Sequence, residues 1–156
     1  MTDIRKGCRI GLDLGQARIG VAKTDIDGIM AVPVGVIRRY ESNEDGIKTI
    51  VKYVRKFNAF EIVVGYPVLL SGKQGTSAKS AKKYAIKLKQ ALPELSVRLV
   101  DERLTTVSAH ASLLEAGKRR NTHKSIIDQV AATYILENAL EYEKKNNQPA
   151  GIEIYL

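Results

Sequence analysis

The chain has 156 residues, and its 25 Lys and Arg outnumber its 17 Asp and Glu, which gives a formal net charge of +8. Hydrophobic residues make up 44% of the chain, too many for a disordered protein, and the length fits a single domain. The lone Cys8 excludes an internal disulfide and a cysteine-based zinc cluster, and no run approaches the ~18 apolar residues of a membrane span. We therefore expect a soluble cytoplasmic domain whose positive charge favours a polyanionic partner.

The first part of the chain predicts three strands joined by hairpins. Residues 8–14 and 18–24 have strand patterns and are separated by a short turn that contains Gly15. Residues 29–37 form a third expected strand, in which Pro33 indicates an edge position or a bulge because proline cannot donate to a ladder.

The rest of the chain alternates helices and strands, and its strands are expected over 61–65 and 96–101. This order implies an α/β fold with a mixed β-sheet, three antiparallel strands first and then parallel strands, flanked by helices. We assign 1–146 to one domain and 147–156 to a C-terminal tail, which could add an edge strand but is expected to fray. Helices are predicted from Ser42 or Asn43 to about 57, from Thr76 or Ser77 to Pro93, from Thr105 or Thr106 to Gly117, and from Thr122 to about 146.

Asp13 interrupts the first predicted strand. The apolar side chains at 10, 12 and 14 share one face, so Asp13 points to the other face, between Gly11 and Gly15. An ionised carboxylate within a strand is unfavourable unless it is paired or binds a metal, and the glycines leave room for a ligand. The alternative is a solvent-facing acid on an edge strand.

Asp128 repeats this pattern on the last predicted helix. Ala131, Ala132 and Ile135 follow it at helical spacing, so the acid lies beside the apolar stripe. Small alanines let such a helix approach a sheet closely. The alternative is an acid near the helix start that is favoured by the helix dipole.

Glu102 is the third candidate acid, and it follows the strand expected over 96–101. Alternation places it on the face of Arg98 and Val100, and strand ends in α/β sheets are common positions for functional sites. Charged residues also end strands for no functional reason, so this signal is weak alone. Together, three acids in a basic chain favour hard divalent cations with oxygen ligands.

Two basic segments are candidate phosphate-binding regions. Six lysines and no acid lie between Lys73 and Pro93, around a glycine-containing loop that leads into a helix N-terminus. A second group lies close to Asp128 and comprises Lys118, Arg119, Arg120, His123 and Lys124. Positive charge next to an acidic site suits a phosphodiester backbone, whereas the alternative is a solvated basic surface.

Four ordered motifs resemble the YqgF/RuvX family. They are Gly11–Gly15 with Arg18–Ala22, Val63–Pro67 with Gly72, Asp101–Thr106, and Ile127–Ala132. The resemblance covers roughly residues 9–140, and it implies an RNase H-like fold and a nuclease, described as a Holliday junction resolvase or a pre-16S ribosomal RNA nuclease. The chain departs from the family at Gly65-Tyr66-Pro67, where Gly-Leu-Pro is frequent.

By this resemblance, Asp13, Glu102 and Asp128 match the catalytic, metal-binding acids of the family. The expected reaction is phosphodiester hydrolysis with two Mg²⁺ or Mn²⁺ ions, one activating water and the other stabilising the leaving oxygen. We take the substrate-binding candidates to be Arg18, Lys73, Arg103, Arg119, Arg120 and Lys124.

Two other functions remain open at this point: a non-catalytic nucleic-acid or ribosome-associated binding module, and an actin-like ATP-binding protein. The second is disfavoured because 156 residues hold no second lobe to enclose a nucleotide. The sequence does not decide between structured RNA and branched DNA, because phosphate contacts carry no base identity. A resolvase that cuts two strands symmetrically would be expected to form a homodimer.

Overall fold

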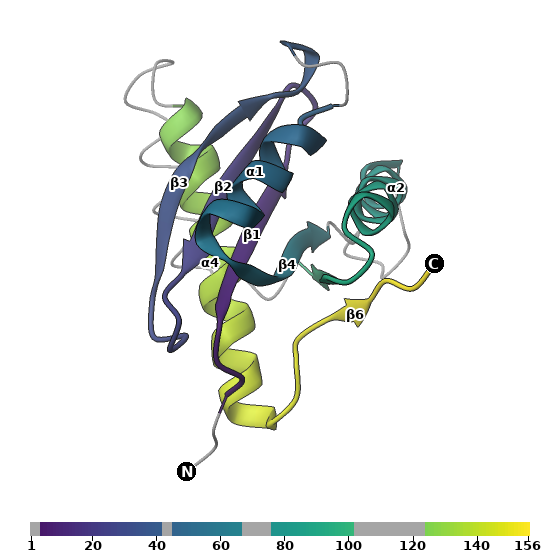
Figure 1. The fold of residues 1–156 in the computed structure, drawn as a ribbon. Helices are drawn as coiled ribbons and strands as arrows, with labels where there is room; N and C mark the ends of the chain where they lie inside the picture. The colour runs from purple at the N-terminus through teal and green to yellow at the C-terminus, as the bar shows by residue number, and fades with distance from the viewer. Residues whose placement is uncertain (1–3, 42–44, 67–75, 102–123) are drawn as a thin grey trace.

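The computed structural model describes residues 4–41, 45–66, 76–101 and 124–156, which form a six-stranded sheet with helices on both faces (Figure 1). The elements are β1 Cys8–Leu14, β2 Arg18–Thr24, β3 Ala31–Arg38, the 3₁₀ turn η1 Arg39–Glu41, α1 Ile47–Phe57, β4 Ala59–Tyr66, α2 Thr76–Ala91, β5 Ser96–Asp101, α4 Lys124–Asn146 and β6 Ile152–Glu153.

The strand order in the sheet is β3-β2-β1-β4-β5-β6. β1 to β3 pair antiparallel, β4 and β5 continue in parallel with β1, and β6 pairs antiparallel with β5. The predicted α/β class and mixed sheet are therefore confirmed.

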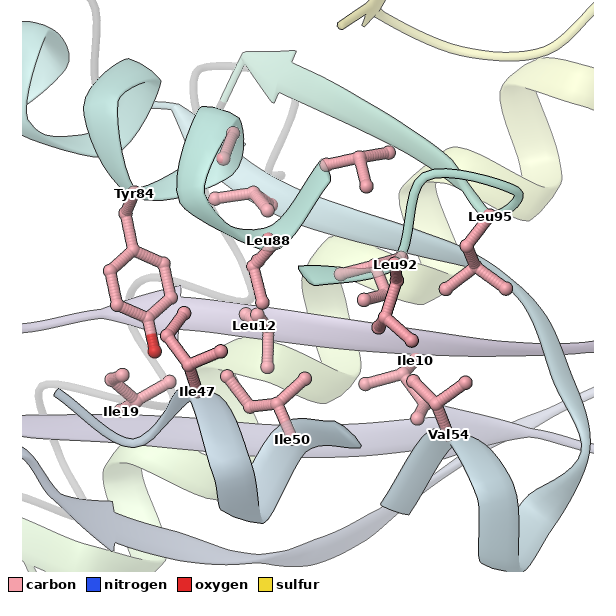
Figure 2. Close-up of a cluster of buried hydrophobic side chains, with 14 of the residues drawn as sticks. Ile10, Leu12, Ile19, Ile47, Ile50, Val54, Tyr84, Leu88, Leu92 and Leu95 are labelled. Carbon is pink, nitrogen blue, oxygen red and sulfur yellow. The ribbon is translucent and has the colours of Figure 1, made fainter. Parts of the chain in front are cut away.

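Each face of the sheet has its own hydrophobic core. Figure 2 shows side chains of α1 and α2 packed over Ile10, Leu12 and Ile19 of β1 and β2. The opposite face is covered by α4, whose Ala132 and Leu136 belong to a second cluster. Successive strand residues alternate between these two cores, as the period of two in a strand requires.

The start of α1 differs from the prediction. The helix begins at Ile47, with Gly46 as its N-cap, and not after Ser42 or Asn43. Asp45 and Gly46 both have left-handed backbone angles, with φ of 54° and 83°, which a right-handed helix cannot include. Two adjacent left-handed residues therefore delay the start of the helix.

Pro33 has both properties that its position in a strand predicted. β3 is the edge strand of the sheet, and its pairing with β2 shifts register between Val21 and Ala22, where Ala22 is opposite Pro33. β3 begins at Ala31, so Ile29 and Met30 lie in the preceding turn and are exposed.

The C-terminal tail does not fray as expected. Ile152 and Glu153 pair with Leu99 and Arg98 of β5, so the tail adds a short edge strand. Gly151 allows the tail to lie this close to β5. Its φ of 77° suits glycine, and a Cβ there would overlap the Leu99 carbonyl oxygen.

A buried network of ion pairs fixes the C-terminal end of α4 against the sheet. Arg5 donates to Glu61 at 2.9 Å and to Glu143 at 2.7 Å, and Arg9 donates to Glu143 at 3.0 Å. Burial raises the pKa of Glu143, but the hydrogen bonds from Arg5 and the charge of Arg9 outweigh it and hold that pKa below its usual value. The network therefore fixes where α4 lies along β1.

Three sequence expectations remain. The helix predicted from Thr105 or Thr106 to Gly117 lies outside the described residues. Cys8 is buried and has no disulfide partner, as expected of a small hydrophobic side chain. No helix within the described ranges is long and apolar enough to cross a membrane.

Candidate active site

Asp13 lies on the face of β1 that is turned towards α4. Ile10 and Leu12 point into the core beneath α1 and α2, whereas Gly11 meets α4, so Asp13 shares the face of Gly11. Its side chain is half-buried. Because β1 is paired on both sides, the alternative of an acid on an edge strand is wrong.

Glycines flank Asp13 on both neighbouring strands. Gly20 of β2 is its Cα partner in the antiparallel pair. On β4, Leu12 is level with Val64, so the parallel register brings Gly65 beside Asp13. Since residues level with each other project to the same face, neither neighbour adds a side chain next to the carboxylate. This leaves lateral space around Asp13 for a ligand.

α4 packs closely against β1 at Gly11. Gly11 allows the contact, because a Cβ there would lie 2.5 Å from Leu136 Cγ and 3.1 Å from the Ala132 carbonyl oxygen. The helix runs antiparallel to β1, since Arg9 meets Glu143 and Gly11 meets Ala132 and Leu136. One helical turn rises about 5.4 Å, close to the advance of about 6.6 Å over two strand residues. From this spacing we expect the backbone of Asp128, one turn before Ala132, to lie near the level of Asp13 along β1.

The end of β5 follows the predicted alternation. Val97 and Leu99 lie in the core under α1 and α2, and Val100 packs in the cluster of α4. The parallel registers place Val100 beside Gly65 and hence level with Asp13 across β4. Glu102 would continue this alternation on the α4 face, but it lies outside the described residues.

The other predicted site residues fall into two groups. The backbone places Lys124 at the start of α4, one turn before Asp128. Among the side chains that the structure describes, no three His, Cys, Asp or Glu come together as a metal site. The residues outside the described ranges are Lys73, Arg103, Arg119 and Arg120.

Arg18 lies in a basic pocket at the tip of the β1–β2 hairpin. Arg18 and Arg38 are Cα partners on β2 and β3, and with Ala17 and Tyr40 they line a pocket of about 300 Å³. The sequence reasoning selected Arg18 but missed Arg38 and Tyr40. The available signal was the run Arg38-Arg39-Tyr40, which puts an aromatic residue next to two cations at the end of a strand.

Arg39 holds this hairpin tip in place. Its guanidinium donates to the Gly15 carbonyl at 2.7 Å and to both oxygens of Asp45 at 2.7 Å each. Its backbone N–H donates to the Ala17 carbonyl, and its guanidinium lies 5.2 Å from the centre of the Tyr84 ring. The hydrogen bonds from Arg39 hold the pKa of Asp45 below its usual value. The turn after Asp13 is thereby tied to the end of β3.

The sheet order, the acid on a central strand and the C-terminal helix across it define an RNase H-like fold. A solved structure described as Thermus thermophilus RuvC in complex with a Holliday junction substrate superimposes with a TM-score of 0.60. The match covers 95% of this chain and 99% of that chain at 9% identity. A second structure of Thermus thermophilus RuvC gives a TM-score of 0.57 at 10% identity, with 94% and 99% covered.

The sequence comparison defines the family. The model of the RuvX family, described as Holliday junction resolvase, matches residues 7–142. A relative from Thermobifida fusca, named "Putative pre-16S rRNA nuclease", is 44% identical over 95% of this chain and 96% of its own. A Mycobacterium leprae protein of the same name is 45% identical over 89% of this chain and 75% of its own. The chain therefore belongs to the RuvX family, which confirms the family and the nuclease class predicted from its motifs.

Proposed function

We propose that this protein is a metal-dependent endonuclease that hydrolyses phosphodiesters of structured RNA or branched DNA in the cytoplasm. The observation that carries the proposal is the position of Asp13 on a central strand, between Gly20 and Gly65, on the face of the sheet that α4 covers. The RuvX family description names Holliday junctions and the relatives are named for pre-16S rRNA, so both substrates are candidates.

Asp13, Glu102 and Asp128 are the residues that would hold Mg²⁺ or Mn²⁺. Carboxylate oxygens are the ligands that these hard cations prefer, and the glycines beside Asp13 leave space for an ion with water around it. A bound pair of such ions polarises phosphoryl oxygens and lowers the pKa of water. Asp13, on the rigid central strand, would orient the site, and Arg18 would hold the phosphate backbone of the substrate.

The decisive test is cleavage by Asp13→Asn of a labelled four-way DNA junction and of a ribosomal RNA precursor, with Mg²⁺, Mn²⁺ or a chelator. We expect the cleavage rate to fall at least about 10²–10³-fold while the fold is retained, because one of the carboxylates that would hold the cation is lost. The matched control is Asp27→Asn, which changes an exposed acid in the β2–β3 turn. Full cleavage by folded Asp13→Asn would exclude the proposed site.

Metal binding can be measured without cleavage. Mn²⁺ that binds the folded state stabilises it by about 2.7 kcal/mol at 100 times its dissociation constant. We expect Mn²⁺ to raise the melting temperature of the native protein and of Asp27→Asn, but not that of Asp13→Asn. Junction cleavage alone, RNA cleavage alone, or metal binding without cleavage would identify a resolvase, an RNA-processing enzyme or a binding module, respectively.

A further inference from the structure

The pocket at the hairpin tip contains Arg38 and Tyr40, which the proposed function does not use. Arg18 and Arg38 face each other across β2 and β3, and Tyr40 follows in the 3₁₀ turn. Tyr40 is 82% exposed, which is unusual for a large aromatic side chain that could have packed against the protein. The pocket thus combines two cations with an open aromatic surface.

This pocket lies on the same face of the sheet as Asp13. Arg18 is two residues from Gly20, the Cα partner of Asp13, so Arg18 projects to the same side as Asp13. Diagonal neighbours across two strands are about 7–8 Å apart, so Asp13 and Arg18 are close enough to contact one nucleic-acid strand. Arg38 extends this surface to the edge strand β3.

The pocket is held in shape by contacts around it. The Arg39 side chain joins the Gly15 carbonyl to Asp45, and its backbone N–H binds the Ala17 carbonyl in the pocket wall. These bonds fix the spacing between the hairpin turn and the end of β3, where Arg38 and Tyr40 lie. A site on such a fixed frame loses less conformational entropy when it binds a ligand.

The chemistry of these side chains selects a nucleotide whose base is unpaired. A guanidinium carries five N–H donors and binds phosphate through a planar fork, so Arg18 and Arg38 can bind a phosphate while also contacting the protein. An exposed tyrosine ring stacks on a nucleobase, and this requires the face of the base to be free of its duplex neighbours. A duplex would satisfy the arginines but not the ring.

We infer that Arg18, Arg38 and Tyr40 form a subsite for an unpaired nucleotide, with its phosphate on the two arginines and its base on Tyr40. The inference rests on the proposed function, because it gives the same endonuclease a preference for substrates with single-stranded segments beside the cleavage site. It assigns specificity to Tyr40 and general affinity to Arg38.

The test is equilibrium binding of a fluorescein-labelled single strand and of a blunt duplex of the same sequence, each as RNA and as DNA, in a chelator so that no cleavage occurs. Tyr40→Ala is expected to weaken single-strand binding about tenfold and to leave duplex binding unchanged. Tyr40→Phe keeps the ring and is expected to bind as the native protein does. Tyr155→Ala is the matched control, since Tyr155 is 77% exposed and lies in the tail.

Arg38→Ala tests the phosphate half of the subsite. It should weaken binding of single strand and duplex alike and reduce the slope of log affinity against log salt by about 1. Arg55→Ala is its control, because Arg55 is exposed on α1, over the opposite face of the sheet. The stacking assignment would be overturned if Tyr40→Ala weakened the binding of both probes equally or of neither, or if Tyr155→Ala weakened binding as much. An unchanged salt slope in Arg38→Ala would overturn the phosphate assignment.

Failure of this inference is distinguishable from failure of the proposed endonuclease. Binding in chelator does not depend on hydrolysis, so a native protein that cleaves neither substrate can still discriminate through Tyr40. Conversely, a Tyr40→Ala variant with unchanged binding removes the subsite even if Asp13→Asn abolishes cleavage.

Discussion

The two ends of the interface between α4 and the sheet treat their carboxylates in opposite ways. At the C-terminal end of α4, Glu61 and Glu143 are 2% and 4% exposed and are held by two arginines. At the other end, Asp13 is half-buried and its neighbours on the adjacent strands are glycines. In the first arrangement the carboxylates are paired with arginines of the protein, whereas in the second the residues beside the acid carry no side chain. The ion pairs at the first end position the helix, and at the other end we propose that the acid takes part in catalysis.

Breaking the buried end should have the largest effect on stability. Glu143→Ala removes the nearer carboxylate from the buried Arg9 and leaves Arg5 with Glu61 alone, and the loss of one member of a buried ion pair typically destabilises by about 3–5 kcal/mol. Urea unfolding should show this loss. The matched control is Glu141→Ala on the same helix, whose pair with Lys145 is exposed to solvent and should add little to stability. Similar losses in both variants would contradict the buried network as the anchor of α4.

Breaking the support of the hairpin tip should have the next largest effect. Arg39→Ala removes three charge-assisted hydrogen bonds, to Gly15 and Asp45, and we expect a loss of about 2 kcal/mol in urea unfolding. Arg55→Ala removes an exposed cation and should be neutral within about 0.5 kcal/mol. If Arg39→Ala is as stable as Arg55→Ala, Arg39 does not hold the tip.

The third prediction concerns Gly20, the Cα partner of Asp13 on β2. Gly20→Ala adds one methyl group beside Asp13 and should lower cleavage about tenfold, because small displacements at a reacting centre are costly. Urea unfolding of the same variant separates a loss of activity from a loss of stability, because Gly20 is buried on the face of the sheet that α4 covers. Gly35→Ala on β3 is the control, because its Cβ would make only an ordinary contact with Tyr53. Full activity in Gly20→Ala would show that the space beside Asp13 is not used.

Local sequence patterns predicted the face of β1 on which Asp13 lies, but they did not predict the position of α4 relative to it. Alternation along residues 8–14 depends only on neighbours in the chain, so the face of Asp13 was predictable. The level of Asp128 relative to Asp13 depends on how α4 is anchored near Glu143, at the far end of the helix. The sequence around Glu143 reads as a solvated helix end, with Glu141, Lys144 and Lys145, and gives no sign that Glu143 is buried.

The basic pocket shows the same limit of sequence reasoning. Arg18 and Arg38 are 20 positions apart and become neighbours only through the register of β2 and β3, which shifts next to Pro33. A shift of one residue in this register would have turned Arg38 to the other face. The tail failed as a prediction for a related reason, because its pairing with β5 depends on Gly151 and on the Arg98 bond to the Ala150 carbonyl.

The smallest expected effect is a pH dependence of the free energy of unfolding, to which Glu143 and Asp45 contribute separately. The pKa of Glu143 is lower in the folded protein than the ordinary value near 4.3, so its contribution to stability is fully present above that pH. It is lost as the pH falls through the folded pKa, because protonation removes the charge that Arg5 and Arg9 face. Asp45, beside Arg39, changes in the same direction. Urea unfolding between pH 5 and pH 3 should therefore show a shallower loss in Glu143→Gln than in the native protein, and Asp45→Asn should reduce the slope independently, since the two acids share no partner. Equal slopes in all three proteins would mean that neither carboxylate is coupled to its arginine, and both the anchored end of α4 and the supported hairpin tip would then need another physical cause.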